Sequence, residues 1–338
     1  MLKTRTELTR HSLSGPTMGT RWSAQFHAPD TVDPVVIEAA LAACVAVVDQ
    51  QMSTWKPDSD LMRLNRAPVG QWVAVPPELM TVLKRALEIG RLSDGAFEIA
   101  MGDAVTAWGF GAQEHDTEAM RRALNQPRPR AHEVLELDHA ARRARKSAAV
   151  TLDLSGIAKG FGVDQMIAVL ARFGIEHALV GLDGELRAIG QRPEGAPWTV
   201  ALEKPDYEVR APLSMLELKD SAVATSGDYR HWVDLGTQRL SHTMDPARGG
   251  PVLGAAASVT VLADTCMDAD AWATAFMVMG KDRASLLARD QGLSAIFVER
   301  DGDTLRQTYI GQGARGGWQS AGIGVIWPHH AKPLPRLP

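Results

Sequence analysis

The chain is poor in cysteine. Only two of its 338 residues are cysteines, Cys44 and Cys266, and they lie far apart and form no CxxC pair. This argues against a thiolate metal site and against a disulfide scaffold. Cys44 falls in an apolar stretch, residues 39–48, where a buried helical thiol is expected.

The chain also lacks an excess of charge and a long hydrophobic run. Its formal net charge is −4, with 22% charged and 45% hydrophobic residues, which is typical of a soluble globular protein and gives no sign of a nucleic-acid surface. The stretch at 39–48 is too short to cross a bilayer, which needs about 20 residues. No apolar segment follows the basic N-terminus. The sequence therefore predicts a cytoplasmic protein with no membrane insertion and no nucleic-acid partner.

Composition divides the chain into a main domain and two ends. Residues 1–15 predict a flexible arm, and residues 311–338 are first Gly-rich and then Pro-rich, which predicts a poorly ordered tail. Residues 16–310 form the predicted domain. Within it, the charged and polar segment 112–147 predicts a small peripheral insert.

The pattern of apolar residues predicts an α+β fold. Helical spacing and strand-like runs follow one another without the regular alternation of a doubly wound sheet, so we expect mixed, mainly antiparallel sheets with packed helices. Helices are predicted at 35–51, 77–92, 158–173 and 284–289, and strands at 20–26, 150–154, 177–180, 185–189 and 295–298, with further short strands from 198 to 260.

The most informative segment follows a β-rich run and opens a helical pattern at residues 267–274. Asp270 and Thr274 are four residues apart, so on a helix they share one face. A carboxylate and a hydroxyl on one face offer oxygen ligands to a hard cation such as Mg²⁺. Helix capping explains an acidic first turn equally simply, and this segment alone favours the cap.

Residues 152–164 run from a predicted strand through small residues into a helix. Small residues let a ligand approach the backbone, and a helix N-terminus offers N–H donors to phosphate. The glycines are spaced as G-x-x-x-G-x-G, which is neither a P-loop nor a dinucleotide fingerprint. A tight turn with a solvated Lys159 is the simpler interpretation of this segment alone.

Two further segments carry candidate site residues. His242 precedes an Asp-Pro turn, an exposed setting where a histidine can exchange protons near neutral pH, although a lone loop histidine is more often only a polar surface residue. Aromatic residues stand between glycines at 95–98 and 108–111. They could stack on a planar ring or fill a core.

Together and in this order, these segments resemble one family, the FAD:protein FMN transferases or ApbE family. The resemblance covers roughly residues 16–310. The matching blocks are TMGT (17–20), MSTWKPDSDLMRLN (52–65), DGAFEIAMGDAVTAWGFG (94–111), LDLSGIAKGFGVD (152–164), TSGDYR (225–230), SHTMDP (241–246) and SVTVLADTCMDADAWATA (258–275).

The resemblance implies an enzyme that moves the FMN part of FAD onto a threonine or serine of a partner flavoprotein. A phosphoester forms, AMP leaves, and a divalent metal, usually Mg²⁺, is required. His242 matches the histidine implicated in catalysis. The positions that match metal-site residues are Gly156 (through its carbonyl), Asp270, Ala273 (whose side chain cannot ligate) and Thr274, and those that match FAD contacts are Met18, Trp55, Ala96, Phe97, Glu98, Asp153, Lys159 and Met244.

The chain departs from the family pattern in two places. Trp55 stands where many members have tyrosine, which keeps a stacking face but removes a phenol hydrogen bond. Residues 181–183 read Gly-Leu-Asp where Gly-Gly-Asp is usual, which puts the backbone contacts of that loop in doubt.

Two other functions fit the same residues. A metal-dependent FAD pyrophosphatase would use water as the attacking group and release FMN and AMP. A flavin-binding protein without turnover is the other alternative, but the presence of Asp270, Thr274 and His242 argues against it.

Overall fold

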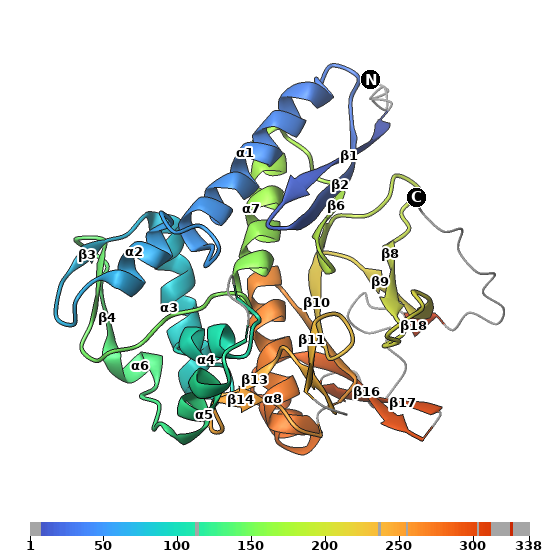
Figure 1. Ribbon diagram of the computed structural model, residues 1–338. Coiled ribbons are helices and arrows are strands. Elements are labelled where there is room, and N and C mark those ends of the chain that lie inside the picture. Colours follow the sequence, from blue (N-terminus) through green and yellow to red (C-terminus); the bar gives the residue numbers. More distant parts are fainter. Residues whose placement is uncertain are drawn as a thin grey trace, which may run out of the picture.

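The computed structural model describes residues 8–111, 115–235, 238–254, 256–302, 304–311 and 325–326. Its centre is an eight-stranded sheet in which every neighbouring pair of strands is antiparallel (Figure 1). The α+β fold predicted from the sequence is confirmed. The strand order is β1 (Thr9–Thr17), β2 (Thr20–Ala28), β6 (Ala178–Leu182), β7 (Glu185–Ile189), β10 (Ser221–Gly227), β15 (Ser258–Ala263), β16 (Ser294–Asp301) and β17 (Thr304–Gly311).

Smaller sheets and hairpins surround the central sheet. Two of them are three-stranded, with the orders β3-β5-β4 and β18-β9-β8, and two are hairpins, β11–β12 and β13–β14. Their bounds are β3 Val73–Ala74, β4 Leu135–Asp138, β5 Arg143–Lys146, β8 Trp198–Glu203, β9 Pro212–Leu218, β11 Trp232–Leu235, β12 Gln238–Ser241, β13 Met244–Asp245, β14 Gly250–Pro251 and β18 Val325–Ile326.

Helices cover one face of the central sheet. Alternate residues of a strand face opposite sides, and Val259 and Val261 of β15 pack in the core with α8, while Leu262 packs on the other face with β8 and β9. The helices are α1 Pro34–Met52, α2 Asp60–Arg66, α3 Pro77–Leu92, α4 Gly102–Ala107, α5 Thr117–Asn125, α6 Ala131–Val134, α7 Ala158–Arg172 and α8 Cys266–Asp290.

α7 and α8 matter most for the site. Their N-terminal ends meet near the centre of the molecule (Figure 1). α8 consists of two helices joined across a kink at Gly280, which has a φ of 75°, and this confirms the two successive helices that the sequence predicts here. A left-handed φ favours glycine at this position.

α1 is the one helix among the described residues that is long and apolar enough to cross a membrane by length and composition. It is longer than the apolar stretch noted in the sequence. However, Ile37, Leu41 and Val45 are buried in the same core cluster as Val163 and Met166 of α7. One face of α1 therefore packs in the core, while Val35, Val36 and Val47 are exposed.

The flexible arm predicted over residues 1–15 is wrong from Thr9 onward, because β1 pairs with β2 along its whole length. His11 stacks on Phe26, with ring centroids 5.1 Å apart, and Gly15 lies against Trp22. Exposed polar residues alternate with these inward positions, which hides the strand from a search for apolar residues. Residues 1–7 lie outside the described part of the chain.

Three other expectations need correction. Residues 150–154 form no strand, because the Leu152 N–H binds the Asn65 side chain and the Asp153 N–H binds the Ile99 carbonyl instead of a ladder. The segment 112–147 is not peripheral, since Leu135 and Ala144 are buried in the main core. Within the tail that was predicted to be poorly ordered, β18 forms a strand that pairs with β9. Residues 312–324 and 327–338 lie outside the described part of the chain.

Candidate functional site

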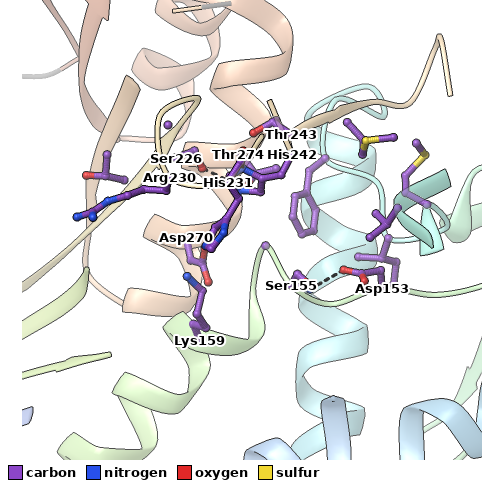
Figure 2. A pocket seen from close by; sticks show the side chains of 18 of the residues that line it. Asp153, Ser155, Lys159, Ser226, Arg230, His231, His242, Thr243, Asp270 and Thr274 are labelled. Atoms are coloured by element: carbon purple, nitrogen blue, oxygen red, sulfur yellow. Dashed lines mark hydrogen bonds between the residues drawn. The ribbon is translucent and has the colours of Figure 1, made fainter. Parts of the chain in front are cut away.

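One cavity of about 310 Å³ brings together the N-terminal ends of α7 and α8, the end of β10 and the chain around β12–β13 (Figure 2). Segments far apart in the sequence therefore meet here. Most residues predicted for the site line this cavity: Ala96, Phe97, Glu98, Asp153, Gly156, Lys159, His242, Met244, Asp270 and Thr274.

Three predicted site residues do not line the cavity. Met18 lies in the turn between β1 and β2, with a φ of 47°, and packs against two core clusters. Ala273 is fully buried in the main core. The side chain of Trp55 is 64% exposed. The structure therefore does not place these three side chains around the cavity.

Asp270 presents a buried carboxylate to the cavity from the second turn of α8. Its Oδ2 accepts the N–H of Gly160 on α7 at 3.0 Å, and only 5% of the residue is exposed. Burial, reinforced by the nearby Glu185 carboxylate, raises the pKa of Asp270. An additional positive charge at this point would stabilise the ionised carboxylate.

Thr274 and Gly156 lie beside Asp270. Thr274 Oγ1 is 3.3 Å from Ser226 Oγ. A Cβ placed on Gly156 would lie 3.0 Å from Thr274 Oγ1, a tight contact from which the hydroxyl would have to shift, so glycine keeps the backbone close to Thr274. The carboxylate, the hydroxyl and the backbone thus offer hard oxygen donors of the kind that Mg²⁺ prefers.

No group of three or more His, Cys, Asp or Glu residues within the described ranges is arranged to hold a metal ion. A cation at Asp270 would therefore have at most two ligands from these residue types in the described part of the chain. The remaining ligands would be hydroxyl, carbonyl, water and phosphate oxygens, which is the common pattern for Mg²⁺ at phosphate-binding sites.

Lys159 is held by two acidic residues, neither of which was predicted as a site residue from the sequence. Its Nζ lies 2.8 Å from Glu185 Oε1 and 3.4 Å from Asp183 Oδ2. Burial alone would lower the pKa of Lys159, but the carboxylates of Glu185, Asp270 and Asp183 outweigh burial and raise it. Figure 2 shows the lysine beside Asp270. The cavity therefore contains a fixed ammonium group.

Glu185 is buried, with 5% of its side chain exposed, and it lines the cavity. Its second oxygen, Oε2, has no hydrogen-bond partner within the described part of the protein. Burial raises the pKa of Glu185. In the sequence it is the first residue of a predicted strand, and no spacing rule distinguishes it from a solvated edge residue. The only sequence signal was an acidic residue directly after the turn at Gly184, and its burial became apparent only in the structure.

His242 is oriented by a backbone carbonyl. Its Nδ1 lies 3.2 Å from the His231 carbonyl oxygen, which also accepts the His242 backbone N–H at 3.1 Å. A carbonyl only accepts, so Nδ1 must carry the proton, and Nε2 is left with a free lone pair. The neutral ring can therefore act as a proton acceptor through Nε2.

The exposed setting predicted for His242 is wrong. The residue is half-buried, and burial, together with the neighbouring His231, lowers the pKa of His242 to about 4. Its ring also has Phe110 at 6.3 Å and His231 at 5.5 Å between centroids. Packing by rings from other segments cannot be read from the local sequence, which showed only a turn.

The chain belongs to the ApbE family, whose sequence profile matches residues 18–297. Two relatives named FAD:protein FMN transferase are similar over most of their length. The one from Vibrio cholerae is 34% identical over 301 residues, covering 87% of this chain and 89% of the relative. The one from Escherichia coli is 32% identical over 300 residues, covering 87% and 85%.

Solved structures show the same fold. The flavin transferase ApbE from Vibrio cholerae superposes with a TM-score of 0.79 at 32% identity, covering 90% of this chain and 97% of that one. The flavinyl transferase ApbE from Pseudomonas stutzeri, in its apo form, gives 0.78 at 31% identity, covering 90% and 95%.

Proposed function

We propose that this protein transfers the FMN part of FAD to a threonine or serine hydroxyl of a partner flavoprotein, with release of AMP. One observation carries the proposal: the ammonium of Lys159, the oxygen donors around Asp270 and the free Nε2 of His242 line one cavity. The relatives named FAD:protein FMN transferase support it.

The site fits a divalent cation. Asp270 and Glu185 are both buried, and Lys159 is the only positive side chain that pairs with either of them in the described structure. Two carboxylates with one ammonium leave a net negative charge in a low-dielectric site, which favours binding of a cation. Asp270, Thr274 and the Gly156 carbonyl would hold Mg²⁺. The ion would neutralise charge on the FAD pyrophosphate during transfer.

The protein's own residues then have distinct tasks. Lys159 holds a fixed positive charge for a phosphate oxygen, and its ion pairs keep it in place. The acceptor hydroxyl gives its proton to His242 Nε2 while its oxygen forms a bond to the FMN phosphorus. The bond between that phosphorus and the bridging oxygen breaks, and AMP leaves with the electron pair. Positioning and electrostatics dominate this type of reaction.

Incubation of the protein with FAD, Mg²⁺ and an acceptor flavoprotein tests the proposal. We expect flavin that stays on the acceptor after denaturation, together with one AMP per flavin. Free FMN instead of acceptor-bound flavin would indicate the pyrophosphatase, and unchanged FAD would indicate a binding protein.

The cytoplasmic location also remains a prediction.

Stacking of Trp55 on FAD remains a prediction as well, because the side chain is exposed and outside the cavity lining. Trp55→Ala should weaken FAD binding about 2- to 10-fold, the effect of one lost aromatic contact. Calorimetric titration with FAD measures the affinity. Trp72→Ala is the matched control, since Trp72 stacks on Arg143 and Arg145 away from the cavity. Equal affinities in all three proteins would remove Trp55 from the flavin site.

A further inference from the structure

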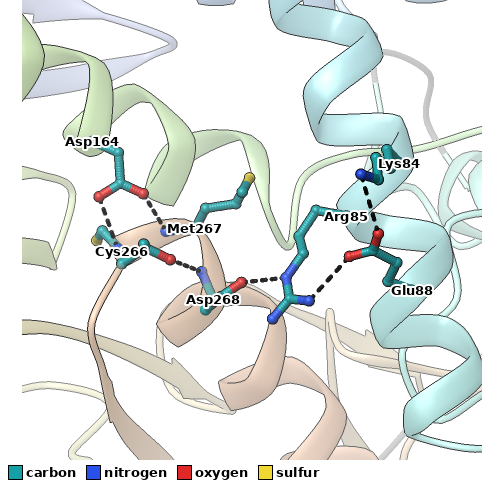
Figure 3. Close-up of polar contacts among 8 residues, drawn as sticks. Lys84, Arg85, Glu88, Asp164, Cys266, Met267 and Asp268 are labelled. Atoms are coloured by element: carbon teal, nitrogen blue, oxygen red, sulfur yellow. Dashed lines mark hydrogen bonds and ion pairs between the residues drawn. The ribbon is translucent and has the colours of Figure 1, made fainter. Parts of the chain in front are cut away.

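The first turn of α8 is held by a side chain of α7 (Figure 3). Asp164 Oδ1 accepts the N–H of Cys266 at 2.9 Å, and Oδ2 accepts the N–H of Met267 at 2.9 Å. These are the first two N–H groups of α8, and a helix offers no internal partner to them. Thr265, the N-cap, accepts the N–H of Asp268. Asp164 thus completes the cap of the helix that carries Asp270.

A second contact on the same face of α7 fixes the distance between the two helices. Gly160 lies four residues before Asp164, so both face α8. A Cβ on Gly160 would lie 2.2 Å from the Cys266 carbonyl oxygen and 2.8 Å from the Asp270 Cβ. The Gly160 N–H also donates to Asp270 Oδ2. α7 therefore touches α8 at its first turn and again at Asp270.

Asp164 is itself oriented by Arg187 of β7. Arg187 Nη1 lies 2.5 Å from Asp164 Oδ1, and the carboxylate is mostly buried, with 12% of its side chain exposed. The carboxylate thus accepts from two amides and one guanidinium. Hydrogen bonds to an ionised acceptor are stronger than those between neutral groups. The two bonds from Asp164 therefore hold the first turn of α8 strongly.

We propose that Asp164 is a positioning residue for the cation site, fixing Asp270 on α8 relative to Lys159 on α7. The proposal rests on the proposed function. Lys159 stands in the first turn of α7 and Asp270 in the second turn of α8, so the packing of the two helices sets how these residues are placed relative to each other. Asp164 does not line the cavity. Its effect is therefore exerted through α8.

The opposite side of the same turn provides a matched control. Arg85 of α3 donates from Nε to Asp268 Oδ1 at 2.7 Å and also pairs with Glu88 (Figure 3). This ion pair is more exposed, with 28% of Arg85 and 23% of Asp268 open to solvent. Arg85→Gln removes a contact from the first turn of α8 without changing its junction with α7.

The test compares Mg²⁺ affinity in Asp164→Asn, Arg85→Gln and the unaltered protein. Asparagine keeps one oxygen for one amide, but its NH₂ group cannot accept from the other. Calorimetric titration of Mg²⁺ into FAD-loaded protein without acceptor should show a dissociation constant raised about tenfold or more in Asp164→Asn, by analogy with residues that orient metal ligands. Arg85→Gln should change it less than about twofold. FAD affinity without Mg²⁺ should stay within about twofold in both, whereas a general loss of structure would lower it too.

Hydrogen exchange gives an independent readout. In the unaltered protein without FAD or Mg²⁺, the Cys266 and Met267 amides should be protected, and they should exchange faster in Asp164→Asn. Should that variant not fold, Arg187→Met, which removes the guanidinium partner, should raise the Mg²⁺ dissociation constant instead.

Three results would overturn the positioning role: unchanged Mg²⁺ affinity in folded Asp164→Asn, equal loss in Arg85→Gln, or unprotected Cys266 and Met267 amides in the unaltered protein. Absence of Mg²⁺ binding in the unaltered protein would overturn the proposed function itself. Normal binding there with no change in the variant would overturn the positioning role alone.

Discussion

Asp270→Asn is expected to reduce FMN transfer at saturating FAD by more than about 100-fold. Residues that merely orient metal ligands are worth about 10- to 100-fold, and Asp270 would itself be a ligand, since it lines the cavity together with Thr274 and Gly156. Asparagine keeps an oxygen that can accept the Gly160 N–H, so the junction of α7 and α8 remains. Transfer assayed over a range of Mg²⁺ concentrations measures the loss.

The asparagine variant is a sharper test than alanine. Asp270 lies near the start of a helix, but the residue is buried and hydrogen-bonded. Alanine would leave the buried Gly160 N–H without a partner, at about 1–3 kcal/mol, and would mix a stability effect with the loss of a ligand. Asp268→Asn, two residues away and outside the cavity lining, serves as control and should stay within a few-fold of normal activity. Near-normal transfer by Asp270→Asn at low Mg²⁺ would contradict the metal assignment.

Helices with regular apolar spacing could be predicted from the sequence. α1, α3 and α7 begin and end within about two residues of the expected bounds, because each buries one continuous face and two of them start at a proline. β1 could not be predicted from the sequence. Its inward-facing positions include His11 and Gly15, which carry no strand signal. Residues 150–154 look like a strand, but side-chain and loop partners take their backbone hydrogen bonds.

The cavity residues could be assigned to one site only through the family resemblance. Helical spacing alone puts Asp270 and Thr274 on one face, and Lys159 in the first turn of a predicted helix. The effect of Glu185 on both Lys159 and Asp270 depends on β7 lying beside α7, which is tertiary information. The low pKa of His242 likewise arises from burial, which no local pattern reveals.

His242→Ala is expected to lower transfer by about 10²–10⁴-fold, the usual effect of losing a general base, while FAD and Mg²⁺ still bind. The burial of His242 changes the pH dependence of transfer from the one that an exposed histidine would give. Because burial lowers the pKa of His242 to about 4, the neutral ring that accepts a proton prevails throughout the neutral range. In the unaltered protein kcat/KM should therefore stay level between about pH 8 and pH 5 as far as His242 is concerned, and should fall only as the pH approaches 4.

His231→Ala tests how the surroundings of His242 set its pKa, without removing the proposed base. The hydrogen bond that fixes the His242 tautomer goes to the backbone carbonyl of His231, so it survives the loss of that side chain. The His231 side chain helps to lower the pKa of His242, so its removal should move the acid limb of kcat/KM to higher pH and leave transfer at pH 7 within a few-fold of normal. Because the raised pKa of Asp270 can add an acid limb of its own, only a limb that moves in His231→Ala is assigned to His242, and such a limb near pH 6.5 in the unaltered protein would contradict the low pKa of His242. A His242→Ala protein that fails only because FAD no longer binds would make His242 a binding residue, and normal transfer by that variant would exclude it as the base.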